Sequence, residues 1–167
     1  MEFLQAISRA LPWEEEAACR GDYAGKTRGT WIIEPSAELA SPHSVAPKLE
    51  TCDSCPVRAD CLSYALSADF TAIGIWGGTT TVERTTLAPR VHESLGSDGE
   101  RRRQIERANE ILTKTHAERL DRWRGFAQEA RKAQQRGKAF RVARERVTEP
   151  LRRCERDVAG ADPTLQL

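Results

Sequence analysis

The sequence predicts an all-α protein: a small helical domain wrapped around a metal centre, followed by a helical C-terminal extension. Apolar side chains recur at steps of three and four residues in several segments, as on one face of a helix. One long stretch, residues 20–50, contains three glycines and three prolines and is expected to be irregular. Four of the five cysteines flank or follow that stretch within residues 19–61. A metal centre is expected to hold the irregular stretch in place.

The N-terminal elements are expected to be short helices over residues 3–11 and 13–19, where apolar residues follow helical spacing. A longer helix is predicted over residues 57–69, with its apolar residues on one face. The glycine-rich segment 74–78 then predicts a turn with a tryptophan at its centre.

Another helix is expected to start near Thr79 and to end before Pro89, because proline cannot continue a helix. Thr80 and Glu83 have the Ser/Thr-x-x-Glu spacing of a capping box, in which each residue satisfies a free backbone N–H of the other.

The C-terminal part favours helix from Glu100 to about Val158, and Gly125 and Gly137 are expected to divide it into two or three helices. Glu118 and Arg122 have the i,i+4 spacing of a helical ion pair. The predicted organisation is a cysteine-bearing domain (1–90), a linker (91–99), a basic helical extension (100–158) and a disordered tail (159–167).

The net charge of +1 conceals an asymmetry between the two parts of the chain. Residues 1–90 carry 8 Lys and Arg against 12 Asp and Glu, or −4, whereas residues 91–167 carry 18 against 13, or +5. A basic extension on an acidic domain suggests contact with nucleic acid.

No apolar run is long enough to span a membrane, and the first residues do not have the pattern of a signal peptide. We therefore expect a cytoplasmic protein without membrane contact. Thiols stay reduced in the cytoplasm, so clustered cysteines favour metal or redox chemistry over disulfides.

The cysteine spacing is C-x32-C-x2-C-x5-C, formed by Cys19, Cys52, Cys55 and Cys61. Thiolates are soft ligands that suit iron–sulfur clusters or zinc. A helix starting after Cys55 would favour an anionic centre at its N-terminus. Zinc sites usually have two close ligand pairs, and only one is present here. Spacing alone leaves iron–sulfur and zinc open.

Two other interpretations fit the cysteines less well. A Cys52-x-x-Cys55 thiol–disulfide pair would normally accompany a βαβ pattern, which is missing. Inert buried cysteines would not be expected to gather in one short stretch. Cys154 lies apart on an apolar helix face and is expected to belong to the core.

Three linked motifs resemble a known family. They are Trp13 with Ala17-Ala18-Cys19-Arg20, then Cys52-Asp53-Ser54-Cys55-Pro56-Val57-Arg58-Ala59-Asp60-Cys61-Leu62, then Gly74-Ile75-Trp76-Gly77-Gly78. In order and separation they are similar to the WhiB-like proteins of actinobacteria and their phages, over about residues 13–90. The resemblance implies a [4Fe–4S] cluster on the four cysteines.

The resemblance also implies a role as a transcription factor whose cluster domain binds region 4 of the principal sigma factor. Sensitivity of the cluster to oxygen or nitric oxide would make the protein a sensor. Trp76 is implied as the leading partner contact, with Gly74, Gly77 and Gly78 of the same turn. Trp31 is implied as a further partner contact. It is the one aromatic at a place where the family often has two, so partner affinity or partner choice is expected to differ.

The extension departs from the family, whose members often end soon after the glycine turn. Arg101, Arg102, Arg103 and Arg107 are its candidate contacts with DNA phosphates. The competing interpretation is a solvated helix face with Glu–Arg pairs. Its large aromatic residues are expected to pack against one another or a second chain: Trp123, Phe126 and Phe140.

The overall hypothesis is a non-enzymatic iron–sulfur transcriptional regulator. The alternatives are a cluster-free protein disulfide reductase using Cys52 and Cys55, and a zinc-stabilised DNA-binding module. The three histidines are scattered and are expected at the surface: His43, His92 and His116.

Overall fold

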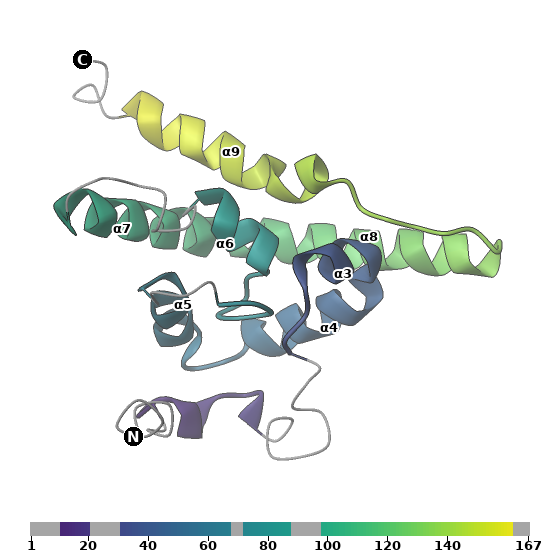
Figure 1. The fold of residues 1–167 in the computed structure, drawn as a ribbon, viewed down its shortest axis with the longest axis horizontal. Coiled ribbons are helices and arrows are strands. Elements are labelled where there is room, and N and C mark those ends of the chain that lie inside the picture. The colour runs from purple at the N-terminus through teal and green to yellow at the C-terminus, as the bar shows by residue number, and fades with distance from the viewer. Residues whose placement is uncertain (1–10, 21–30, 68–71, 88–97, 162–167) are drawn as a thin grey trace, which may run out of the picture.

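The computed structural model describes residues 11–20, 31–67, 72–87 and 98–161, and within these ranges the chain is helical without a strand (Figure 1). The all-α prediction is confirmed for this part of the chain. Its elements are a 3-10 helix η1 (Glu14–Glu16), α3 (Pro35–Ala40), α4 (Pro42–Asp53), α5 (Arg58–Ser67), α6 (Thr81–Leu87), α7 (Asp98–Lys114), α8 (His116–Gln135) and α9 (Arg144–Ala161).

The expectation of an irregular stretch over residues 20–50 was wrong from Pro35 onward. Helices α3 and α4 begin at Pro35 and Pro42, where proline is well tolerated because the first N–H of a helix needs no partner. Pro47 lies inside α4 as well. Proline therefore marks helix starts here, and glycine-containing residues 21–30 lie outside the described ranges.

The other N-terminal predictions had mixed outcomes. The expected helix over 13–19 is only the single turn of η1, and residues 3–11 lie outside the described ranges. The helix predicted over 57–69 is present as α5.

Three helices form the extension. Gly125 lies inside α8 without ending it, whereas Gly137 ends it, with a φ of +65°. The N–H of Gly137 donates to the carbonyl of Gln134 at 3.0 Å, and that of Lys138 to Ala133 at 2.9 Å. This pair of bonds is a Schellman motif, which satisfies the last carbonyls of α8.

The extension and the cysteine-bearing segment share their hydrophobic core. Helices α4 and α8 form the most extensive helix contact among the described elements and lie side by side in Figure 1. One core cluster joins Trp31, Val45 and Leu49 to Trp123 and Phe126 of α8. The rings of these last two residues meet edge to face, with centroids 5.7 Å apart.

A second core cluster also combines residues of the cysteine-bearing segment and of the extension. It combines Leu62 and Leu66 of α5 and Leu87 of α6 with Ile111 and Leu112 of α7 and Leu151 of α9. Burial of apolar side chains is the main stabilising term in folding, so the two segments stabilise each other.

None of the helices in the described ranges combines the length and the apolar character that crossing a bilayer requires.

Candidate metal centre

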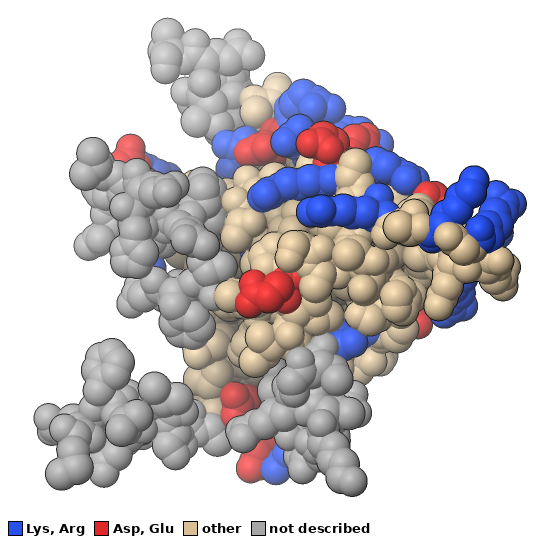
Figure 2. Space-filling view, turned by 45° about the vertical axis from the view of Figure 1, so that its right-hand side comes forward, with Lys and Arg blue, Asp and Glu red and all other residues tan. Residues whose placement is uncertain are grey.

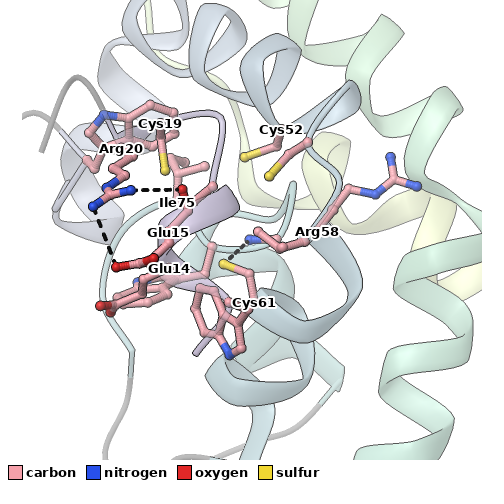
Figure 3. Close-up of a pocket in the computed structure, with 15 residues that line it drawn as sticks. Glu14, Glu15, Cys19, Arg20, Cys52, Arg58, Cys61 and Ile75 are labelled. Carbon is pink, nitrogen blue, oxygen red and sulfur yellow. Dashed lines mark hydrogen bonds and ion pairs between the residues drawn. The ribbon is translucent and has the colours of Figure 1, made fainter. Parts of the chain in front are cut away.

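The structure brings all four predicted cysteines to one cavity of about 300 Å³ (Figure 3). Cys19 follows η1, Cys52 lies in the last turn of α4, Cys55 lies in the α4–α5 turn, and Cys61 lies in the first turn of α5. None of them forms a disulfide. Figure 3 shows the labelled sulfurs of Cys19, Cys52 and Cys61 directed toward a shared space.

The α4–α5 connection positions three of these thiols through consecutive tight turns. The N–H of Cys55 donates to the carbonyl of Cys52 at 3.2 Å, and that of Arg58 to Cys55 at 3.3 Å. The N–H of Cys61 then donates to Val57 at 3.0 Å as α5 begins. The Cys-x-x-Cys-x5-Cys spacing thus brings three cysteines to one cavity without a long loop.

Backbone N–H groups are directed at the sulfurs. Gly77 donates to Sγ of Cys61 at 3.2 Å, Ala18 donates to Sγ of Cys55 at 3.5 Å, and the N–H of Gly78 bonds Cys52. Such bonds favour thiolate over thiol and tune the potential of a bound cluster.

Burial opposes ionisation of the same thiols. It raises the pKa of Cys52 to about 12 and that of Cys61 to about 11, and the neighbouring cysteines add to both shifts. Ligand thiols must lose their protons to bind metal. Their ionisation here therefore depends on a bound cation to offset the negative charge.

The four cysteines line one cavity. Within the described ranges, no three His, Cys, Asp or Glu side chains are grouped tightly enough to hold a single metal ion. Thiolates are soft ligands that suit zinc or an iron–sulfur centre.

The glycine turn forms one wall of the cavity. Trp76 and Thr79 exchange N–H···O bonds of 3.0 and 2.9 Å, and Gly77 and Gly78 between them have φ values of +53° and +74°. Positive φ at both central positions defines a type I′ turn. A Cβ on Gly77 would lie 2.5 Å from the backbone nitrogen of Leu62, so only glycine fits against α5.

Two buried charged side chains, Arg84 and Glu38, hold the glycine turn and the start of α6 in place. Arg84 donates to the carbonyls of Gly74 and Thr79 at 2.8 Å and also to that of Ala72. Burial lowers the pKa of Arg84 to about 10, which leaves it charged at neutral pH. Glu38 accepts the N–H groups of Thr81 and Val82 at 2.8 and 3.1 Å, at the start of α6.

The capping box predicted at Thr80 and Glu83 is confirmed. The N–H of Thr80 donates to Oε2 of Glu83 at 2.8 Å, and the N–H of Glu83 donates to Oγ1 of Thr80 at 3.2 Å. Helix α6 therefore starts at a fixed place directly after the glycine turn.

Comparison with known proteins identifies the family. The model of the family described as transcription factor WhiB matches residues 13–87. The transcriptional regulator WhiD of Streptomyces coelicolor is 34% identical over 85 residues, which cover 50% of this chain and 70% of WhiD. The chain belongs to the WhiB family. No solved structure matches it significantly. The family assignment makes it a transcriptional regulator.

The WhiB match ends at Leu87, before α7, yet α8 reaches back to the glycine turn of the matched segment. Arg119 donates to the carbonyl of Gly78 and to Oε2 of Glu83, both at 3.0 Å. Trp123 donates its indole N–H to the other oxygen of Glu83 at 3.1 Å. Sequence reasoning missed this network, although Arg119 lies on the apolar face of its helix.

His116 was expected at the surface, and that expectation was wrong. Its ring packs against Gly78, and its Nε2 lies 2.9 Å from Oδ1 of Asp53, the residue after Cys52. Burial and two nearby arginines lower the pKa of His116. His43 is exposed as expected, and His92 lies outside the described ranges.

The implied partner-binding residues occupy different environments. Trp76 is half-buried at the edge of the cavity, in a row with Tyr64 and Trp13 whose ring centroids are 5.8 and 5.9 Å apart. We call these three residues the aromatic row. Trp31, in contrast, is 3% exposed in the core and lines the cavity. It is not available for surface contact, because it is buried in the first core cluster with residues of α4 and α8.

The candidate DNA-binding arginines begin α7. Arg102 and Arg103 are exposed, Arg101 is half-buried, and Arg107 pairs with Glu155 of α9 at 3.8 Å. The predicted pair of Glu118 and Arg122 is confirmed at 3.4 Å. Cys154 is half-buried against the second core cluster, far in sequence from the other thiols.

Proposed function

We propose that this WhiB-family regulator binds a [4Fe–4S] cluster through Cys19, Cys52, Cys55 and Cys61 and, in that state, binds region 4 of the principal sigma factor. The observation that carries the proposal is the convergence of these four thiols on one cavity. The cavity, the soft donor set and the N–H groups directed at sulfur all fit a cubane cluster.

The bound cluster would supply a centre that reacts with electrons, oxygen or nitric oxide. The chain's own residues determine access to it. Glu14 and Glu15 are exposed and line the cavity, so it reaches the surface. Gly77 and Ala18 hold two sulfurs in position through their N–H groups. These features support a redox-responsive or nitric-oxide-responsive role.

The partner face in this proposal is the aromatic row. Trp76 stands at the cavity edge with its indole N–H bonded to the carbonyl of Ile73 at 3.0 Å, so its orientation is fixed. Aromatic rings with few rotamers make strong interface anchors. Any change at the four thiols would be transmitted to this face through Gly77. The basic extension would add contact with DNA.

The alternatives fit the site less well. A disulfide reductase needs a thiolate nucleophile, and burial opposes ionisation of Cys52 by raising the pKa of its thiol to about 12. A structural zinc site usually has two close ligand pairs, and only one, Cys52 and Cys55, is present here.

The test is anaerobic purification followed by a visible spectrum and iron and sulfide analysis. Wild type should be coloured, with about four iron atoms per chain. Cys52→Ala should be colourless and poorly folded, and the matched control Cys154→Ala should retain colour and iron. Wild-type levels of iron and visible absorbance in Cys52→Ala would refute the ligand assignment.

The partner claim has a separate test. Wild type co-expressed with sigma region 4 should purify as a complex, and Trp76→Ala should lose the complex while keeping its visible spectrum. Absence of a complex with coloured wild type would refute sigma binding and leave the cluster assignment standing.

A further inference from the structure

Residues 130–144 contain six basic residues and no acidic one. All six are exposed, and they follow the end of α8, the connection to α9 and the first residue of α9. We call this surface the basic ridge; it consists of Arg131, Lys132, Arg136, Lys138, Arg141 and Arg144. Figure 2 shows Lys and Arg gathered at the right-hand end of the molecule, where Figure 1 places this connection.

The ridge concentrates the positive charge of the chain. It carries +6, so the remaining residues, with 20 Lys and Arg against 25 Asp and Glu, carry −5. The arginine triplet at the start of α7 does not produce a comparable net charge. Residues 98–110 contain four arginines and four carboxylates, which cancel. An anionic ligand is therefore attracted to the ridge and not to α7.

The backbone of the ridge is held in place. The Schellman motif at Gly137 fixes the end of α8. Val142, 1% exposed, donates its N–H to the carbonyl of Leu39 at 2.9 Å, and Phe140 packs against the core. These inward residues leave Lys138 and Arg141 on the outer side. The basic side chains thus project from a defined surface.

Stability of the fold accounts for only two of the six basic residues of the ridge. None of its six side chains forms an ion pair with any residue in the described ranges, whereas nearby Arg146 binds Glu129 through two bonds. Cations at the C-terminus of α8 would favour its dipole, which explains Lys132 and Arg136. Arg144 begins α9, where a positive charge is unfavourable.

We infer that the basic ridge binds the phosphate backbone of duplex DNA. The inference rests on the proposed function as a transcriptional regulator and names the surface of the extension that meets DNA. Four of the six cations are arginines, whose forked donors match phosphate oxygens. Ile32 is the one exposed large apolar residue in the described ranges, so the ridge has no apolar anchor for a membrane or a protein hot spot.

The position of the ridge agrees with this role. The α8–α9 connection lies at one end of the long axis of the molecule, and η1, which lies between Trp13 and Cys19, and α5, which carries Cys61 and Tyr64, lie toward the other (Figure 1). DNA on the ridge would leave the aromatic row accessible to a protein partner.

The experiment measures binding of the full-length, anaerobically purified protein to a fluorescent random-sequence DNA duplex of about 20 base pairs, across a range of KCl concentrations. The ridge variant is Arg136→Gln/Lys138→Gln/Arg141→Gln. Each phosphate contact contributes about 0.9 to the slope of log affinity against log salt. Losing three contacts should lower the slope by about 2.7 and the affinity by up to about 500-fold at 0.1 M salt.

The matched control is Arg101→Gln/Arg102→Gln/Arg103→Gln, which removes the same charge and should bind DNA within about threefold of wild type. Arg136→Lys/Arg141→Lys keeps the charge and should keep the wild-type slope. An equal or larger loss in the α7 control, or wild-type affinity in the ridge variant, would overturn the inference. Tighter binding of wild type to an RNA duplex or to phosphatidylglycerol vesicles would also overturn it.

Cluster and partner measurements distinguish this inference from the proposed function. The ridge variant should keep the visible absorbance, the helical circular dichroism and the sigma complex of wild type, since its three residues are exposed and remote from the cysteines. A ridge variant that fails in DNA binding but keeps these three properties supports the inference. Loss of absorbance in that variant would contradict it.

Discussion

Replacement of Arg119 by methionine tests the central structural claim, that the extension supports the glycine turn. Arg119 and Glu83 have side chains 1% and 0% exposed, with Nη1 and Oε2 3.0 Å apart. Methionine removes the charge and keeps most of the volume. It leaves the Glu83 carboxylate without its closest cation and deprives the carbonyls of Gly78 and Leu112 of a donor.

Breaking a buried ion pair by removing one partner costs about 3–5 kcal/mol. With a urea dependence of about 2 kcal/mol per molar, Arg119→Met should lower the unfolding midpoint by about 1.5–2.5 M. Adding Glu83→Gln removes the uncompensated charge, so the double variant should be more stable than Arg119→Met alone. Such coupling is expected only between residues in direct contact.

The assay is urea unfolding followed by circular dichroism at constant cluster occupancy. The control is Arg124→Met on the same helix. Arg124 is exposed and pairs with Glu50 and Asp121, and its replacement should leave the midpoint close to wild type, because exposed pairs are screened by solvent. Equal midpoints for Arg119→Met and Arg124→Met would refute the buried network.

Three further predictions follow from the same packing. Gly77→Ala should lose iron binding and at least about 2 kcal/mol of stability, because of its positive φ and the clash with Leu62; an unchanged iron content would contradict this. Trp123→Phe removes the indole donor to Glu83 and should lower the free energy of unfolding in urea by about 2 kcal/mol. A decrease of less than about 0.5 kcal/mol would count against that hydrogen bond. A chain ending at residue 97 should not unfold cooperatively by calorimetry, since it lacks six of the fourteen buried residues of the first core cluster and four of the seven of the second. A sharp transition would show that the WhiB segment folds alone.

Local sequence patterns predicted the elements whose determinants are close in sequence. The Thr80–Glu83 capping box and helix α5 are both specified within a few residues. Helices α3 and α4 were missed because proline was treated only as a breaker, although it also starts helices. Proline can therefore end a helix or start one. Ser41 before Pro42 is a favourable N-cap residue type and was a usable signal for α4, whereas Glu34 before Pro35 gave none for α3.

The four cysteines were predictable as a set because their spacing and neighbours are specific. What surrounds them was not, since it comes from residues distant in sequence. His116 meets Asp53 across 63 positions, and Arg119 meets Gly78 across 41. One signal was available: Arg119 falls in register with Trp123 and Phe126 on the apolar face of α8. A charged residue on such a face predicts a buried carboxylate partner.

Helix α8 fixes the distance between the glycine turn and the basic ridge. Its first turn carries Arg119, which holds the glycine turn, and its last turn carries Lys132 of the basic ridge. A helix of 20 residues spans about 30 Å. Because α8 is packed along α4 and continues through Gly125 without interruption, this spacing cannot vary as it would across a flexible linker. A protein bound at the aromatic row and DNA bound at the ridge would therefore be held at one separation and orientation.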